Sequence, residues 1–235
     1  MNYLVTLNIG NVLTQNSRES MQAAAERWGC LFIEIKENLV GNHAIHFNKY
    51  RGAYNLICDR HNRADSIMFI DADTMIRSDA PNPFELFQGP YVFGVLDSVC
   101  APDQAAWRAD VIGSWLWRDH ERLRRPIPFE ALQKSADLWF INAGVWIVNP
   151  GAYCCLTDFL SNMASEPGHG RPEQSLWNYV CVSRDAIRWM PPTWNKIQPD
   201  LSSGQMQDYV YHFTGPNDYE KVKAAVGTYD WRTIP

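Results

Sequence analysis

Short apolar runs along the chain alternate with stretches in which apolar residues return at helical spacing. Runs rich in β-branched and aromatic residues are typical of strands, and they occupy residues 3–7, 31–35, 66–71, 91–97 and 139–149, followed by the shorter IRWMP and YVYHFTG. Helical patterns cover residues 45–60, 104–125, 152–163 and 173–182, with a short turn at NPFELF. Strands that alternate with helices in this way predict an α/β fold with a mostly parallel central sheet flanked by helices.

The first helix shows its apolar face and both of its ends in the sequence. Asn16 is the expected N-cap, with Glu19 three residues later as its capping-box partner. Gly29 stands where a helix of this length should end. The apolar face consists of residues at i, i+3, i+4 and i+7, namely Met21, Ala24, Ala25 and Trp28.

Composition limits the class of protein. The chain has 235 residues, 46% of them hydrophobic and 20% charged, which suits a single globular domain over residues 1–235. A net charge of -5 argues against a nucleic-acid partner. Six cysteines lack the spacing of a zinc site and predict reduced thiols. The chain shows neither a secretory signal nor an apolar run of membrane-spanning length, so we expect a cytoplasmic protein, peripheral at the inner membrane face as the alternative.

Ten tryptophans form an unusually large aromatic set. They either build a large core or, in part, offer stacking platforms for a sugar. Four of them are candidates for stacking on an acceptor, although core packing explains the strand pair equally well: Trp115, Trp117, Trp139 and Trp146.

The stretch SIMFIDADTMI carries the first sign of chemistry, because an apolar strand leads directly into Asp71 and Asp73. Side chains at i and i+2 of an extended backbone point the same way. Two such carboxylates repel each other unless they share a proton or a cation. Oxygen ligands of this kind suit Mg²⁺ or Mn²⁺, so the sequence predicts a divalent-cation site.

Further motifs follow in a fixed order after Lys49 and FIDADTMI, namely FINAGV, PEQSLWN, MPPTWN and YHFTG. Together they resemble the glycogenin and lipopolysaccharide galactosyltransferase family, retaining glycosyltransferases of the GT-A fold. The resemblance spans residues 49–215. It implies a metal-dependent transferase that moves a sugar from a nucleotide-sugar donor, expected to be a UDP-sugar, to an acceptor that is a glycan, a lipid-linked group or a protein. The sequence also allows the protein to form a homo-oligomer.

The resemblance implies a cation site of three side chains. Asp71 is placed against the ribose and the metal, while Asp73 and His212 are direct ligands of Mn²⁺ or Mg²⁺. Carboxylate and imidazole ligands fit such an ion, which acts as a Lewis acid on the departing nucleoside diphosphate.

The resemblance also implies a set of donor-binding and catalytic residues. Lys49 contacts the donor, and Gly144 lets the backbone approach it closely. Asn142 presents an amide to the sugar or acceptor. Gln174 lies beside the anomeric carbon, with Glu173 where the family has an aspartate. An amide is a poor nucleophile, so front-face displacement with retention is expected rather than a covalent intermediate.

Two departures from the family pattern concern the nucleotide. The family has a lysine six residues after the metal histidine, and this chain has Asp218 there. The nearest lysine is Lys221, which we expect to contact the donor in its place. The resemblance also implies that Gly215 is a donor-binding position. The family aromatic that stacks on uracil is absent from the N-terminal loop. We therefore expect Thr6 and Asn8 to bind the base through polar contacts.

Two alternatives compete with the transferase interpretation. A haloacid-dehalogenase-type phosphatase also begins with a strand and DxDxT, and Asp71 would then be the nucleophile. Roughly 65 residues precede the motif, however, and no later paired-aspartate motif completes a Mg²⁺ site. The second alternative is a GT-A-like module that binds a sugar or nucleotide without catalysing transfer.

Overall fold

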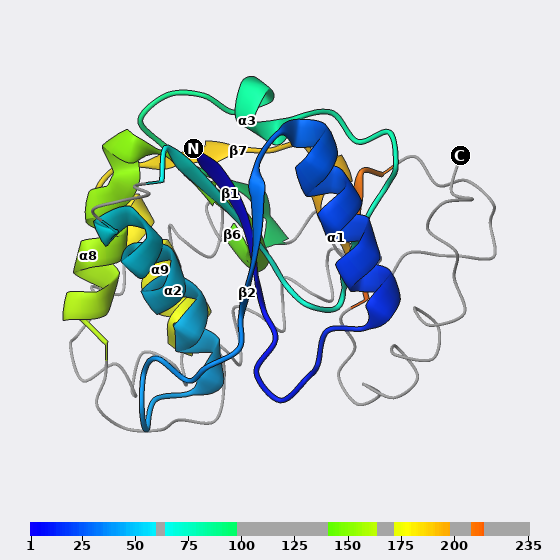
Figure 1. The fold of residues 1–235 in the computed structure, drawn as a ribbon. Helices are drawn as coiled ribbons and strands as arrows, with labels where there is room; N and C mark the ends of the chain where they lie inside the picture. Colours follow the sequence, from blue (N-terminus) through cyan, green and yellow to red (C-terminus); the bar gives the residue numbers. More distant parts are fainter. Residues whose placement is uncertain (60–63, 98–140, 164–171, 198–207, 214–235) are drawn as a thin grey trace.

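A computed structural model describes residues 1–59, 64–97, 141–163, 172–197 and 208–213 (Figure 1). The strands are β1 Asn2–Leu7, β2 Leu31–Ile35, β3 Ser66–Ile70, β4 Thr74–Ile76, β5 Val92–Leu96, β6 Ile141–Val148, β7 Ile187–Trp189, β8 Lys196–Ile197 and β9 Val210–His212. The helices are α1 Gln15–Trp28, α2 Asn48–Cys58, α3 Pro83–Leu86, α8 Tyr153–Ser161 and α9 Pro172–Ser183, with 3-10 turns η1 Ile45–Phe47, η3 Pro150–Ala152 and η4 Pro192–Trp194. The predicted alternation of strands and helices is confirmed across these residues.

The main sheet has six strands in the order β2-β1-β3-β6-β5-β7, and a small sheet has the order β4-β9-β8. Among the described strands of the main sheet, only β6 runs against its neighbours, pairing antiparallel with both β3 and β5. The sheet is mostly parallel, as predicted. Because β6 is reversed, its first residues lie beside the carboxyl end of β3, with Ile70 opposite Val145. The Asp71 amide donates to the Gly144 carbonyl at 2.8 Å, so the strand direction joins two distant motifs.

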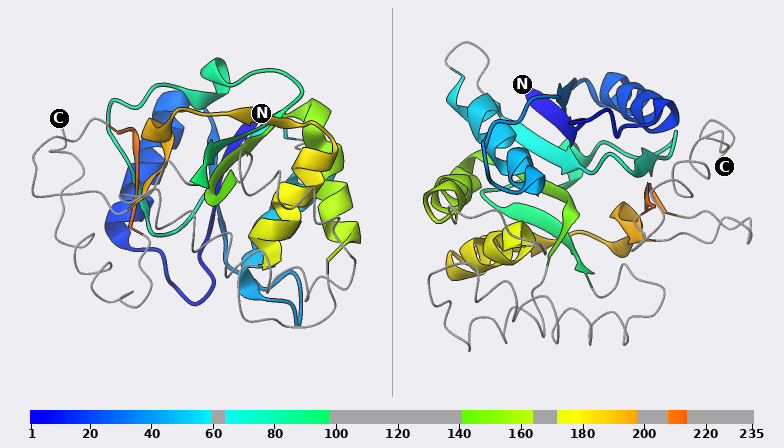
Figure 2. Two further views of the ribbon diagram at one scale, coloured as in Figure 1. Left: turned by 180° about the vertical axis from the view of Figure 1, so that it is seen from behind. Right: turned by 90° about the horizontal axis from the view of Figure 1, so that it is seen from below.

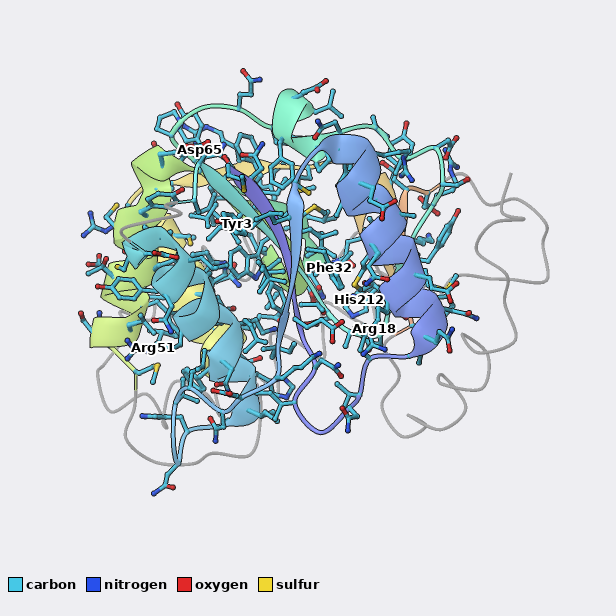
Figure 3. The ribbon with its side chains drawn as sticks, viewed as in Figure 1. Tyr3, Arg18, Phe32, Arg51, Asp65 and His212 are labelled. Carbon is cyan, nitrogen blue, oxygen red and sulfur yellow. The ribbon has the colours of Figure 1, made fainter. Side chains whose placement is uncertain are left out.

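Strand residues alternate between two apolar cores, one on each face of the main sheet. Helices cover both faces of this sheet (Figure 2). Tyr3 and Phe69 face the layer of α2, α8 and α9, where Tyr3 is drawn among the packed side chains of Figure 3. Leu4 and Met68 face α1 and the small sheet. The period of two in β1 and β3 therefore explains why helices cover both faces.

Helix α1 begins two residues earlier than the sequence suggested. Thr14 is the N-cap, with an extended backbone and an Oγ1 that accepts the Ser17 amide at 3.2 Å. The prediction of Asn16 as the cap is wrong, because Asn16 already lies inside the helix and Thr14 accepts the free amide of its third residue. Gly29 ends the helix as predicted, at φ 63°, a left-handed conformation that favours glycine.

Trp146 belongs to the core and not to an acceptor surface. It is fully buried and lies against Tyr50 at 5.5 Å and Phe69 at 5.4 Å between ring centroids. Of the two alternatives given for this residue, core packing is the one that the structure shows, because α2, α8 and α9 cover that face of β6.

Several predicted features lie outside the described residues. They are the helix at 104–125, Trp115, Trp117, Trp139, Gly215, Asp218 and Lys221. In the described part of the chain, no helix combines the length and apolar character needed to cross a membrane.

Candidate functional site

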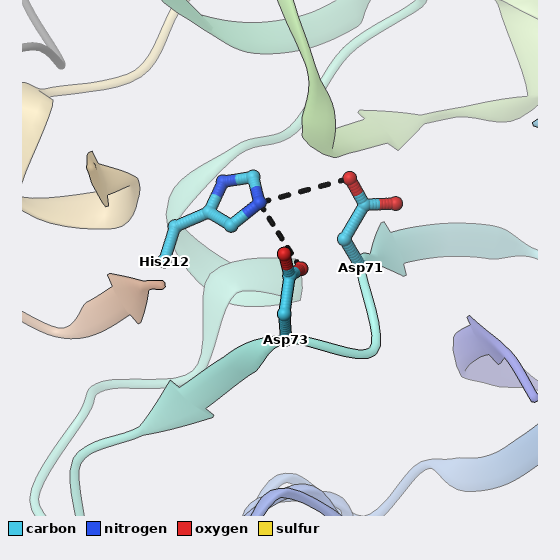
Figure 4. A group of neighbouring side chains, drawn as sticks. All are labelled: Asp71, Asp73 and His212. Atoms are coloured by element: carbon cyan, nitrogen blue, oxygen red, sulfur yellow. Dashed lines mark ion pairs between the residues drawn. The ribbon is translucent and has the colours of Figure 1, made fainter. Parts of the chain in front are cut away.

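Asp71, Asp73 and His212 converge at the carboxyl end of β3 (Figure 4). The His212 Nε2 atom lies 3.2 Å from Asp73 Oδ1 and 3.7 Å from Asp71 Oδ2. One potential ligand atom from each residue lies within 4.8 Å of the other two. Two carboxylates and one imidazole at this spacing can hold a divalent cation.

A turn, and not an extended strand, sets the direction of the two carboxylates. The backbone turns at Ala72 and Asp73 before β4 begins, and Thr74 Oγ1 donates to the Asp71 carbonyl at 2.7 Å. In the small sheet Thr74 pairs with His212, which brings the imidazole opposite the turn. The expectation of an extended i, i+2 pair is therefore wrong in its geometry, although the two residues do cluster.

Positive groups offset the charge of this acidic cluster. Burial opposes ionisation of Asp73, but His212 and Lys49 together hold the pKa of Asp73 below its ordinary value. Lys49 is buried, and its Nζ donates to the Ala143 carbonyl at 3.1 Å and lies 3.5 Å from Asp71 Oδ1. The ammonium thus lies beside the predicted cation site, and its contact with a donor stays a prediction.

A chain of buried polar side chains runs behind the cluster. His212 Nδ1 lies 2.9 Å from Asn195 Oδ1, and Asn195 Nδ2 donates to Asn142 Oδ1 at 2.8 Å. Asn142 Nδ2 in turn donates to Asp97 Oδ1 at 2.6 Å, and Gln174 Nε2 approaches the same oxygen at 3.4 Å. The chain connects the histidine of the cluster with the predicted catalytic glutamine.

The cluster opens into a polar cavity of about 160 Å³. The described residues that line it are His46, Lys49, Asp71, Asp73, Asn142, Ala143, Gly144, Glu173, Gln174 and His212. Among them are both of the predicted catalytic side chains of α9. Glu173 is buried, and its Oε2 has no hydrogen-bond partner among the residues that the structure describes. A buried carboxylate oxygen of this kind suits a hydroxyl group of a ligand.

Gly144 leaves the space in which the cluster assembles. A Cβ atom at this position would lie 2.3 Å from His212 Cε1 and 2.9 Å from Asp71 Oδ2. Only glycine fits without displacing one of these side chains. The prediction that Gly144 lets the backbone approach the donor stays a prediction. In the structure, the missing side chain makes room for the side chains of the cluster.

A second, more apolar pocket adjoins the cluster. Leu7, Ile9 and Val12 line it together with Ile45 and Ala72, and His46, Asp71 and Asp73 belong to both pockets. Its position suits a flat aromatic group next to the cation site.

The two residues predicted to bind a base lie elsewhere. Asn8 is buried, with Nδ2 donating to Glu34 Oε2 at 2.7 Å and Oδ1 accepting the Leu13 amide at 3.0 Å. Thr6 is fully buried and is not part of either pocket wall. Their base-binding roles stay predictions, and the structure gives Asn8 a task in fixing the N-terminal loop.

Sequence reasoning missed three residues of this region. Asp97 follows a strand much as Asp71 does, and that position was a usable signal. Asn195 ends the quoted MPPTWN motif but received no role. His46 carries no local pattern, and only the fold reveals that it lies between the two pockets.

Solved structures, rather than sequences, relate this chain to known proteins. No family model matches it, and no curated protein is similar to it in sequence. A glycosyltransferase involved in the glycosylation of the major capsid of PBCV-1 is 14% identical, with 97% of this chain and 99% of that chain covered and a TM-score of 0.63. The chain has the GT-A glycosyltransferase fold.

Two other GT-A structures extend this likeness. The glycosyltransferase GlyE of Streptococcus pneumoniae TIGR4 is 14% identical, covering 99% of this chain and 61% of that chain, with a TM-score of 0.53. The galactosyltransferase LgtC, solved with donor and acceptor sugar analogs, is 12% identical over 97% of this chain and 96% of that chain, with a TM-score of 0.50. At these identities the likeness concerns the GT-A fold, and the function has to be argued from the site.

Proposed function

We propose that this protein is a metal-dependent glycosyltransferase that moves a sugar from a nucleotide-sugar donor to an acceptor. The proposal rests on one observation, which is that a group of possible cation ligands lies next to a polar cavity on a GT-A fold. Asp71, Asp73 and His212 form a cation-binding group at the rim of a cavity that also holds Glu173 and Gln174. An apolar pocket adjoins the same aspartates.

The donor set favours Mn²⁺ as the cation. Mg²⁺ is bound mainly through oxygen ligands, whereas an imidazole nitrogen beside two carboxylates suits Mn²⁺ as well. When bound, the cation supplies Lewis-acid stabilisation of the leaving diphosphate. The adjoining Lys49 ammonium adds a second positive charge near Asp71, where a phosphate or a sugar hydroxyl accepts its hydrogen bonds.

The two pockets suggest how the donor lies. We place the nucleoside in the apolar pocket of Leu7, Ile9 and Val12 and the sugar in the polar cavity. The diphosphate then crosses Asp71 and Asp73, which border both spaces. UDP-sugar is our preferred donor class on the strength of the motif resemblance.

In the part of the cavity where we place the sugar, we assign separate roles to Glu173, Asn142 and Gln174. Glu173 presents a buried carboxylate that accepts a hydrogen bond from a sugar hydroxyl, and Asn142 positions the cavity wall. We assign Gln174 to the reacting carbon, where its neutral amide would stabilise and orient rather than attack. Retention by front-face displacement is the outcome that we propose for this arrangement.

The first experiment is a thermal-shift screen of UDP, GDP, CMP, ADP and dTDP, each with and without Mn²⁺. A ligand that binds only the folded state raises the melting temperature by mass action. We expect a Mn²⁺-dependent shift with UDP that exceeds the shift with Mn²⁺ alone. Transfer or hydrolysis of the matching sugar nucleotide, followed by mass spectrometry, then tests turnover.

The alternatives give different results in the same experiments. A phosphatase would show no nucleotide preference and would hydrolyse simple phosphomonoesters with Mg²⁺, an outcome that the GT-A fold argues against. A module without activity would show the UDP and Mn²⁺ shift but no turnover of any sugar nucleotide. The absence of a shift with every nucleotide would contradict the proposed function.

A further inference from the structure

The buried amides behind the cluster have only one consistent hydrogen-bond assignment. The Gly144 backbone N–H lies 2.9 Å from the side-chain atom of Asn142 that is assigned as Oδ1. A backbone N–H can only donate, so this atom has to be the oxygen. The other amide atom of Asn142 is then the nitrogen, which agrees with its position 2.6 Å from an Asp97 carboxylate oxygen.

The same reasoning extends from Asn142 to the imidazole. The Asn195 atom that lies 2.8 Å from Asn142 Oδ1 must be a donor, and is therefore Nδ2. Asn195 Oδ1 consequently faces His212 Nδ1 at 2.9 Å, and the Nδ1 atom has to carry the proton of that hydrogen bond. In the neutral ring the lone pair is left on Nε2, the atom that points at Asp73 and Asp71.

We infer that Asn195 is a positioning residue for the cation site, because it holds His212 in the tautomer that presents the Nε2 lone pair to the metal. A histidine that binds a metal commonly donates its other ring N–H to a carbonyl or carboxylate group, which fixes the ring and increases its basicity. Asn195 is fully buried and makes this bond with a carbonyl oxygen that the preceding constraints have already oriented. The inference rests on the proposed metal-dependent function and adds to it the residue that prepares its nitrogen ligand.

A packing role alone would not need this arrangement. An amide that only filled space would tolerate either orientation, whereas the Gly144 N–H and the Asp97 carboxylate leave Asn142, and through it Asn195, a single choice. The four elements concerned are β6, the end of β5, the segment after η4, and β9. They meet only in the folded chain, so the tautomer of His212 is a property of the assembled site.

The test measures binding of Mn²⁺ alone, by the loss of the electron paramagnetic resonance signal of free Mn²⁺, without any nucleotide. Asn195→Leu removes the acceptor at nearly constant volume, and we expect an approximately 10- to 100-fold weaker Mn²⁺ affinity. Asn195→Asp retains an acceptor for the Nδ1–H, so this variant should bind Mn²⁺ more tightly than Asn195→Leu. If the aspartate variant were as weak as the leucine variant, the proposed acceptor role would be overturned.

Asn149→Leu is the matched control. Asn149 is also a buried asparagine, and its side chain donates to the Phe87 and Gly89 carbonyls at the opposite end of β6. This variant should lose stability but keep the Mn²⁺ affinity of the original protein. An equal loss of Mn²⁺ affinity in Asn149→Leu and Asn195→Leu would assign both effects to general destabilisation and overturn the inference.

A double-mutant cycle separates action through His212 from action on the aspartates. In a His212→Ala background, Asn195→Leu should weaken Mn²⁺ binding by less than about twofold, because the ligand through which it acts is gone. An undiminished effect would contradict the inference. Unchanged Mn²⁺ affinity in Asn195→Leu alone overturns only the role of Asn195. If the original protein did not bind Mn²⁺, both the metal-dependent function and the role of Asn195 would be overturned.

Discussion

Single side chains decide whether the cluster can form, and Gly144 is the most sensitive of them. A methyl group at Gly144 has no room, because His212 and Asp71 already occupy the space next to its Cα. We expect Gly144→Ala to displace one of these two side chains. The Mn²⁺ affinity should fall at least tenfold, and overpacking should cost about 1–3 kcal/mol of folding stability.

Gly94→Ala provides the control for this variant. A Cβ atom at Gly94 would lie 2.4 Å from Ile141 Cγ2, so this variant is also overpacked, but against an apolar side chain of the core. It should lose stability by a similar amount and keep its Mn²⁺ affinity. Calorimetric titration with Mn²⁺, together with urea unfolding of both variants, checks the comparison. If Gly144→Ala bound Mn²⁺ normally, the tight packing around the cluster would not matter for the ion.

At the scale of elements, the N-terminus of α1 offers a test of where the helix begins. Thr14 accepts the Ser17 amide, and loss of such a cap typically costs about 1 kcal/mol. We therefore expect Thr14→Ala to lower the free energy of unfolding by this amount in urea titrations. Asn16→Ala, at the position that the sequence favoured, should change it by less than about 0.5 kcal/mol. The reverse order would place the cap at Asn16 after all.

The same helix illustrates what the sequence can and cannot predict about an element. The apolar stripe from Met21 to Trp28 and the Gly29 stop depend on local periodicity and backbone preference, and both were predictable. Thr14 and Asn16 are both good capping residues, so composition alone could not choose between them. The reversal of β6 was hidden for a different reason. An apolar run predicts a strand but carries no information about its direction in the sheet.

Some residues of the candidate site could also be predicted from the sequence, and others could not. Asp71 and Asp73 could be proposed from SIMFIDADTMI because a strand that ends in two carboxylates is a local signal. His212 needed the order of several motifs, and its meeting with the aspartates depends on the pairing of β4 with β9. Asp97 follows a strand and Asn195 ends the MPPTWN motif, but their roles depend on hydrogen bonds to residues far apart in sequence, which neither position reveals. Asn142 was predictable because the family resemblance of FINAGV implies a role for it.

For the molecule as a whole, the cluster lies where two sheets meet. Asp71 follows β3 of the main sheet, whereas His212 belongs to β9 of the small sheet and Asp73 leads into β4. Open α/β folds bind ligands beyond the carboxyl ends of their strands, and this position agrees with that rule. A cation bound by all three residues would therefore connect the sheets as well as serve the proposed reaction.

This position predicts that Mn²⁺ stabilises the entire fold. At a free concentration about 100 times its dissociation constant, an ion that binds only the folded state adds about 2.7 kcal/mol to the free energy of unfolding. Urea titrations with Mn²⁺ and with EDTA should differ by this amount, and the slope with urea should stay the same because the folded state is unchanged. Asp73→Ala should abolish the difference, whereas Asp185→Ala, at an exposed turn, should retain it. A Mn²⁺ effect that persisted in Asp73→Ala would mean that the ion binds elsewhere and does not connect the two sheets.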